Sequence, residues 1–180
     1  MKDLPKNHFS MHGLWPSFSN GQQIGDCNSG SDIKIIEDAS DLFSEMDVKW
    51  PSYTSPNTKF WGHEFNKHGF CYTTKYKIQD YKLYFKYALN VFDKYSFDTV
   101  MKRAFGDLQG EHSFSVQDLM SHLQAQLGDL IFELDCKPVS GGHQHLQEVR
   151  FFFDLDLKPT SNYPRRTDCN NNKPVFVFFR

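Results

Sequence analysis

The residues with the clearest chemical potential lie between Phe60 and Cys71, in the sequence FWGHEFNKHGFC. This segment contains two imidazoles, a carboxylate and an ammonium close together, at His63, Glu64, Lys67 and His68. On a helix that turns by about 100° per residue, these four side chains would share an arc of about 140°, and Phe65 would point away from them into a core. The pattern therefore predicts one helix face able to transfer protons and to bind an anionic group.

Zinc binding is a competing interpretation of the same segment. Zinc protease helices have the pattern HExxH, in which two histidines four residues apart chelate one ion. Here His63 and His68 are five residues apart, diverge by about 140° on a regular helix, and have Lys67 between them. We therefore expect no metal at this site, and keep a zinc hydrolase and a solvated helix face with clustered charges as alternatives.

A second histidine lies in the segment HFSMHGLWP, residues 8–16. The alternation of Phe9 and Met11 predicts a short strand that stops at Gly13 and Pro16. His12 would then lie near the end of a strand. Residues 17–31 are rich in Ser, Asn, Gly and Gln, which predicts a loop.

The remaining elements predict an α+β fold with helices in the middle of the chain and strands toward the ends. Apolar spacing and helix-breaking residues predict four helices. They cover residues 40–46, 81–95, 98–105 and, after a cap at Ser115, the residues up to Leu127. Trp50 and Pro51 end the first of these helices. Strands are predicted over 130–135, 147–157 and 174–179, the last buried on both faces.

Composition narrows the classes of function. The 180 residues are 39% hydrophobic and 16% aromatic, typical of one globular domain, and no apolar run is long enough to span a membrane. The net charge of -2 argues against strong sequence-independent nucleic-acid binding at neutral pH. Protonating all eight histidines would raise the charge to about +6, so an anionic substrate is favoured in an acidic compartment.

The four cysteines predict two disulfides and an oxidising compartment, because no CxxC pair is present to suggest zinc or thiol exchange. Three pairings are open from the spacing alone. The residues after Met1 do not resemble a signal peptide.

The two histidine segments, FSMHGLWP and FWGHEFNKHGFC, resemble the active-site segments of the ribonuclease T2 family. These are secreted and endolysosomal acid ribonucleases, including plant self-incompatibility ribonucleases. The resemblance extends weakly from His8 to Arg180 and implies a single domain over residues 1–180, with a central, mostly antiparallel sheet packed against helices. Family members have a further strand ahead of the first histidine segment, so we expect the domain to be incomplete at its N-terminus.

The resemblance implies a role for each chemical residue. His12 is similar to the general acid that protonates the departing 5′ oxygen, and His68 to the general base that takes the proton from the ribose 2′-OH. His63 resembles a phosphate-binding histidine, and Glu64 with Lys67 would stabilise the pentavalent phosphorane. No metal or other cofactor is required.

The family also implies binding residues and disulfides. Trp15 is similar to an aromatic residue of one base pocket, and Phe60, with Pro56 and Asn57, to those of a second pocket. A core role for Trp15 or Phe60 is the alternative. The implied pairs are Cys27 with Cys71, and Cys136 with Cys169.

The predicted function is a metal-independent endoribonuclease that cleaves single-stranded RNA with low base specificity, forming 2′,3′-cyclic phosphate and then 3′-phosphate ends. RNA supplies its own nucleophile, so a base, an acid and a cation suffice. DNA, which lacks the 2′-OH, is not cleaved. We expect a monomer in an extracellular, endolysosomal or vacuolar location. The alternative is a catalytically impaired binding, defence or signalling protein of the same fold.

Overall fold

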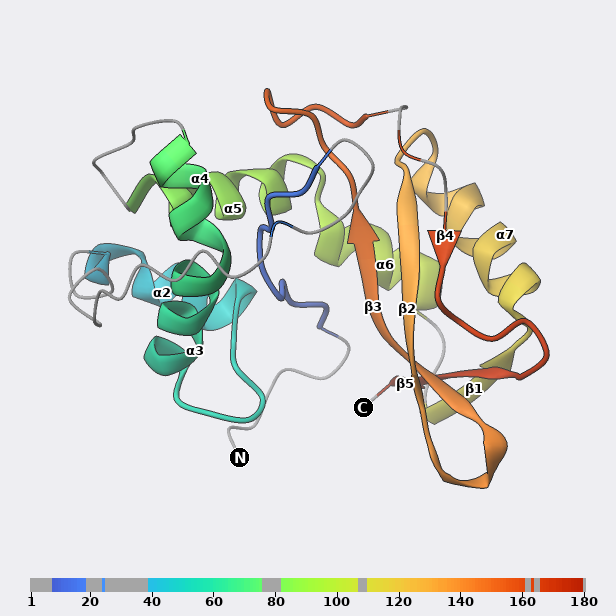
Figure 1. Cartoon of the computed structure of the whole chain (residues 1–180). Coiled ribbons are helices and arrows are strands. Elements are labelled where there is room, and N and C mark those ends of the chain that lie inside the picture. The colour runs from blue at the N-terminus through green and yellow to red at the C-terminus, as the bar shows by residue number, and fades with distance from the viewer. Residues whose placement is uncertain are drawn as a thin grey trace. The chain divides into compact units, whose positions relative to one another are not determined.

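The computed structural model of the chain describes residues 8–18, 24, 39–75, 82–106, 110–160, 163 and 166–179. These residues form two compact units, one chiefly Phe9–Asp98 and the other chiefly Thr99–Arg180 (Figure 1). Cys27 and most of the loop expected over 17–31 lie outside the described residues. The single domain over 1–180 stays a prediction.

The first unit is built from short helices. In chain order they are η1 (Ser40–Leu42), α2 (Phe43–Lys49), α3 (Asn57–Glu64), η2 (Phe65–Gly69), α4 (Phe70–Lys75) and α5 (Lys82–Lys94), and α6 (Phe97–Phe105) begins here and continues into the second unit. The helices predicted over 40–46, 81–95 and 98–105 are confirmed within the described residues.

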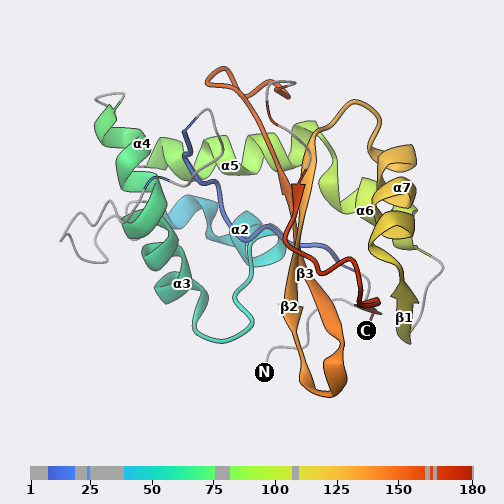
Figure 2. The ribbon, with the colours of Figure 1, turned by 45° about the vertical axis from the view of Figure 1, so that its right-hand side comes forward.

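The segment with the two histidines is one helical run through α3, η2 and α4 (Figure 2). The middle part, η2, is a π-helical turn, in which the Phe70 N–H bonds to the Phe65 carbonyl five residues earlier. Such turns widen a helix and often occur at functional sites. The regular helix assumed from the sequence is therefore wrong between Phe65 and Gly69.

Buried aromatic side chains form the core of this unit. Phe65 is buried as predicted, with its ring 5.6 Å from that of Tyr84 and 5.9 Å from that of Phe85, both on the buried face of α5. The rest of this core is Ala39, Met46, Trp50, Trp61, Ala88 and Leu89. The helical run with the two histidines thus packs on α5 through its apolar side.

Residues 8–16, all of which the structure describes, form no strand, so that prediction was wrong. The Met11 N–H bonds to the Lys49 carbonyl at 2.8 Å, and the Tyr84 hydroxyl donates to the Leu14 carbonyl at 2.9 Å. The alternating pattern marks an extended chain, but these partners come from the end of α2 and from α5, not from a neighbouring strand.

The second unit contains a five-stranded sheet in the order β1-β5-β3-β2-β4. The strands are β1 (Gly110–Phe114), β2 (Phe132–Pro138), β3 (Gln144–Phe151), β4 (Arg166–Thr167) and β5 (Val175–Phe179). The longer ladders, β1 with β5 and β2 with β3, are antiparallel, and β2 with β4 and β3 with β5 are short parallel pairs. The predicted α+β fold with a mostly antiparallel sheet is confirmed.

The helix α7 (Val116–Leu127) packs beside the sheet and begins as predicted. The Ser115 hydroxyl accepts the Asp118 N–H at 3.0 Å, which satisfies one free donor of the first turn. Leu119, Leu123 and Leu127 are buried along one face.

Strand boundaries differ from those predicted. The second strand extends to Pro138, the third ends at Phe151 instead of 157, and β1, with the polar sequence GEHSF, was not predicted. In the last strand Val175 and Val177 are buried while Phe176 is half-buried, so the prediction of burial on both faces is wrong.

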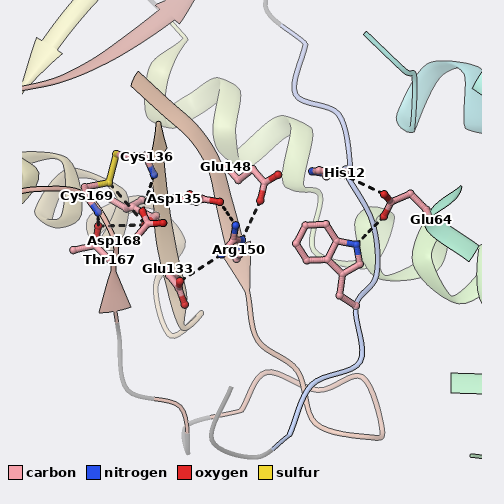
Figure 3. A network of polar contacts seen from close by, with 12 residues as sticks. His12, Glu64, Glu133, Asp135, Cys136, Glu148, Arg150, Thr167, Asp168 and Cys169 are labelled. Atoms are coloured by element: carbon pink, nitrogen blue, oxygen red, sulfur yellow. Dashed lines mark hydrogen bonds and ion pairs between the residues drawn. A yellow bond between two sulfur atoms is a disulfide. The ribbon is translucent and has the colours of Figure 1, made fainter. Parts of the chain in front are cut away.

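A group of charged side chains joins β2 to β3. Arg150 lies opposite Glu133 in the ladder and pairs with the carboxylates of Glu133, Asp135 and Glu148 (Figure 3). The Glu133 contact is 3.6 Å and the Glu148 contact 3.0 Å. One guanidinium thus neutralises part of an acidic surface within the sheet.

The disulfide between Cys136 and Cys169 is present, as the family resemblance implied. Cys71 is also disulfide-bonded, and its expected partner, Cys27, lies outside the described residues. None of the helices that the structure describes is long and apolar enough to cross a membrane.

Candidate active site

His12 and Glu64 come together although they are far apart in the sequence. The Nε2 atom of His12 lies 3.6 Å from Oε1 of Glu64 (Figure 3). The His12 side chain is 46% exposed, whereas that of Glu64 is 3% exposed. The exposed His12 imidazole therefore lies beside the buried Glu64 carboxylate.

Trp15 completes this arrangement. Its indole Nε1–H donates to Oε2 of Glu64 at 2.7 Å, so the two carboxylate oxygens face different partners. Gly13 makes the approach possible, because a Cβ atom there would lie 2.4 Å from both Glu64 Oε2 and Trp15 Nε1. A side chain at position 13 would thus clash with Glu64 and Trp15, so the site requires a glycine there. Sequence reasoning did not identify this role of Gly13.

His68 joins the same group from the π-helical turn. Its ring stacks on Trp15 with centroids 4.9 Å apart and planes 27° apart. The His12 ring meets Trp15 edge to face, at 4.8 Å and 74°. The rings of His12 and His68, the two histidines predicted to be catalytic, therefore both contact the Trp15 indole.

The environment gives the carboxylate and the buried imidazole different charges. Burial pushes the pKa of Glu64 upward, but hydrogen bonds from His12 and Trp15 and the charges of His12 and His68 outweigh it, so the pKa is lowered. Burial is the largest cause that lowers the pKa of His68, and together with the charges of Lys67, His63 and His12 it outweighs the opposing charge of Glu64. The site favours an ionised Glu64 and a neutral His68.

The four charged residues of the helix do not share one exposed face. Glu64 and His68 are buried, while His63 and Lys67 are exposed. The expected single face assumed a regular helix, and η2 changes the rotation between His63 and His68. Lys67 and His63 still lie near enough to lower the pKa of His68 by their charges.

The residues expected in the second base pocket lie in different surroundings. Phe60 is half-buried, with its ring 5.7 Å from that of His12, and Pro56 is exposed before the first turn of α3. Asn57 is buried: its amide oxygen accepts the Ser52 N–H at 2.8 Å, and its amide nitrogen bonds Asp47. The Asn57 side chain therefore braces the turn before α3, contrary to what a base contact would require.

One further neighbour was missed by sequence reasoning. The Trp50 indole N–H donates to the His12 carbonyl at 2.5 Å. From the sequence, Trp50 and Pro51 indicated only the end of a helix, and no local pattern could connect them to His12. In the described ranges, no group of three or more His, Cys, Asp or Glu side chains is arranged to hold a metal ion.

Comparison with known proteins finds one family throughout. A sequence profile of the Ribonuclease T2 family matches residues 1–169. Ribonuclease DdI of Dictyostelium discoideum is 36% identical over 103 residues, which are 57% of this chain and 44% of that protein. Ribonuclease T2 of Homo sapiens is 30% identical over 168 residues, 92% of this chain and 61% of that protein. The chain thus spans about half the length of these two relatives.

Solved ribonuclease structures also resemble this chain in fold. A mutant of ribonuclease MC1, a protein from the seeds of bitter gourd, in complex with 5′-UMP, has a TM-score of 0.72 and 26% sequence identity. The similarity covers 96% of this chain and 83% of that one.

Proposed function

Since the chain belongs to the ribonuclease T2 family, we propose that it cleaves single-stranded RNA without a metal ion, by transfer to the 2′-hydroxyl. The observation that supports this most strongly is the pair of imidazoles beside Trp15, with ring centroids 4.8 and 4.9 Å from it. One imidazole rests on an ionised carboxylate and the other is buried and favoured neutral. Acid and base catalysis needs two such proton-transfer groups, one of them neutral to act as the base.

In the first step, the neutral His68 takes the proton of the ribose 2′-OH. The 2′ oxygen forms a bond to phosphorus, the bond from phosphorus to the 5′ oxygen breaks, and protonated His12 gives its proton to that oxygen. The product is a 2′,3′-cyclic phosphate. In the second step the roles reverse, and water opens the ring to a 3′-phosphate. Each proton transfer contributes about 10²-fold to 10⁴-fold in rate.

Glu64 has a different role from the one expected from the sequence. A buried anion would repel a phosphorane, and its oxygens already face His12 and Trp15. We assign Glu64 to hold the His12 imidazolium and the Trp15 ring. The exposed cations, Lys67 and His63, are then the groups that bind the phosphate and neutralise charge on its nonbridging oxygens.

Base binding in this proposal depends on ring stacking. Trp15 and Phe60 both lie within ring-contact distance of His12, and stacking accepts any base, so base specificity is low. Pro56 stays a candidate contact at the edge of this area. DNA has no 2′-OH and is not cleaved.

The compartment and assembly also belong to the proposal. The disulfide between Cys136 and Cys169 favours an oxidising location, outside the cell or in an endolysosomal or vacuolar compartment. We propose that one chain is enough for the reaction and that the protein acts as a monomer, since the residues assigned to the reaction all lie within one unit of the chain.

The test is cleavage of a single-stranded RNA oligonucleotide by the oxidised protein at mildly acidic pH in the presence of EDTA. We expect cyclic phosphate ends, and a loss of at least about 10²-fold in kcat for His12→Ala and for His68→Ala. His143→Ala, an exposed histidine of the other unit, is the matched control and keeps full activity.

Activity abolished by EDTA, or kept in both alanine variants, would contradict the proposed mechanism. RNA binding without turnover above background would instead favour the non-catalytic alternative.

A further inference from the structure

The backbone that bears His12 is held by one side-chain donor and one backbone acceptor from the end of α2. Residues 8–16 form no strand, yet the Trp50 indole N–H reaches the His12 carbonyl at 2.5 Å. One residue before, the Met11 N–H bonds to the Lys49 carbonyl at 2.8 Å. Two adjacent residues at the end of α2 therefore bind two adjacent residues of the histidine segment, as a strand would do in a sheet.

Trp50 is itself fixed from several sides. It is fully buried, and its ring lies 6.1 Å from that of Tyr84 and 5.8 Å from that of Phe85. Its backbone N–H bonds to the Met46 carbonyl at 2.7 Å, and its carbonyl accepts the Trp61 indole N–H, also at 2.7 Å. The indole that meets His12 therefore has little freedom to move.

We propose that Trp50 is a positioning residue for the general acid: its indole N–H fixes the peptide plane after His12 and so aims the imidazole at the leaving oxygen. This inference rests on the proposed function. His12 is anchored at two points, its carbonyl on Trp50 and its Nε2 atom beside Glu64, with Cα and Cβ between them. With both points fixed, the direction of the side chain is determined.

The consequence concerns one step of the reaction. Proton transfer requires donor and acceptor within hydrogen-bond reach, and a misplacement of about 1 Å can cost about 10²-fold in rate. Loss of the Trp50 donor frees the His12 peptide plane while leaving His68 and its stacking on Trp15 in place. Protonation of the leaving group therefore suffers, and activation of the 2′-OH does not.

The experiment removes only the N–H group. Trp50 is replaced by 3-benzothienylalanine, which has the shape of tryptophan with sulfur in place of N–H. Two substrates are compared: a dinucleotide, whose 5′-hydroxyl leaving group needs a proton, and uridine 3′-(4-nitrophenyl phosphate), whose leaving group does not. We expect kcat for the dinucleotide to fall about 10- to 100-fold with KM unchanged, and kcat for the nitrophenyl ester to fall less than about threefold.

Trp61 is the comparison, because its indole N–H bonds the Trp50 carbonyl and so acts on the His12 carbonyl only through Trp50. The same replacement at Trp61 is expected to change the ratio of the two kcat values less than the replacement at Trp50 does. Trp50→Phe is a second variant that lacks the indole N–H. If part of this variant fails to fold, kcat falls equally for both substrates, so the ratio of the two kcat values still reports on the positioning of His12.

An equal loss on both substrates, or no loss on the dinucleotide, would overturn the positioning role while the proposed function stands. A parent protein that cleaves neither substrate would refute the proposed function itself. His12→Ala calibrates the ratio, because it removes the general acid completely.

Discussion

In the proposed mechanism, Glu64 is the residue that separates the roles of His12 and His68. Its carboxylate is buried, accepts the Trp15 N–H at 2.7 Å and lies 3.6 Å from the His12 Nε2 atom. The lowered pKa of Glu64 places an anion beside His12, whereas burial and nearby cations favour a neutral His68. The two histidines thus have different surroundings, which supports the opposite roles that we propose for them.

This charge arrangement predicts opposite effects of two substitutions on the pH dependence. The charge of Glu64 raises the pKa of His68, and the charge of Lys67 lowers it. Since the base is active when neutral, the acid limb of kcat/KM follows this pKa. Glu64→Gln should move the acid limb to lower pH, and Lys67→Gln to higher pH, both with reduced maximal activity.

The measurement is kcat/KM against pH for each variant. Lys59→Gln, an exposed lysine on α3, is the matched control and should leave the limb in place. Shifts of the same sign in Glu64→Gln and Lys67→Gln would contradict the charge arrangement.

Gly13 provides a steric prediction at the same scale. A Cβ atom there would lie 2.4 Å from Glu64 Oε2 and from Trp15 Nε1, so Gly13→Ala must displace one of them. We expect kcat/KM to fall at least about tenfold, with a loss of stability of about 1 to 3 kcal/mol from overpacking.

Activity and urea unfolding should be measured on the same sample. Gly142→Ala is the comparison, because its Cβ would meet open space while its φ of +80° strains an alanine. It should cost stability without reducing kcat/KM. If Gly13→Ala were as active as the parent, the hydrogen bond from Trp15 to Glu64 would not be needed for catalysis.

Residue types and spacing led to the charged residues of the candidate site, because proton transfer and phosphate binding use side chains such as His and Lys. They could not identify Gly13 or Trp50. The need for glycine arises from atoms of Glu64 and Trp15, and the Trp50 bond joins residues 38 positions apart. Such requirements exist only in the folded chain.

At the scale of elements, periodic apolar residues predicted the helices well. The stripe of α5 follows the helical repeat, and Ser115 with Asp118 correctly marked the start of α7. The strand over 8–16 was wrong because alternation reports an extended chain and not its hydrogen-bond partner. The turn η2 could not be predicted, since the sequence alone does not reveal a change from the regular helical repeat.

The start of α7 gives a prediction at this scale. Ser115→Ala removes the acceptor of the Asp118 N–H and should lower the free energy of unfolding by about 1 kcal/mol. RNA cleavage should be unchanged, because α7 contributes no residue to the site.

Urea unfolding of the two variants checks this. Ser121→Ala, an exposed serine within α7, is the control and should change stability by less than about 0.5 kcal/mol. A loss as large in Ser121→Ala as in Ser115→Ala would contradict the cap.

At the scale of the whole molecule, the candidate site and the disulfide that the structure describes belong to different units. The site is built from residues of the first unit, and the Cys136–Cys169 disulfide closes the sheet region of the second. The family resemblance supplied this pairing, because the spacing of four cysteines allows three. Stability and catalysis are therefore expected to respond separately to changes in the two units.

Replacing both Cys136 and Cys169 by alanine tests that separation. The bond joins residues 33 positions apart, so its loss should reduce stability by about 4 kcal/mol on the chain-entropy estimate. Under conditions where the variant remains folded, kcat for RNA should match that of the parent. Thermal unfolding measures the loss of stability, and RNA cleavage is measured at a temperature where the variant is folded. Loss of activity in a fully folded variant would contradict the separation of stability from catalysis.

The most direct test of the central claim is cleavage of a DNA strand that contains a single ribonucleotide. If His68 activates a 2′-OH and His12 protonates the 5′ oxygen, the strand should break only on the 3′ side of that ribose and carry a 2′,3′-cyclic phosphate there. Cleavage at any deoxyribose, or a product with a 5′-phosphate, would contradict the account.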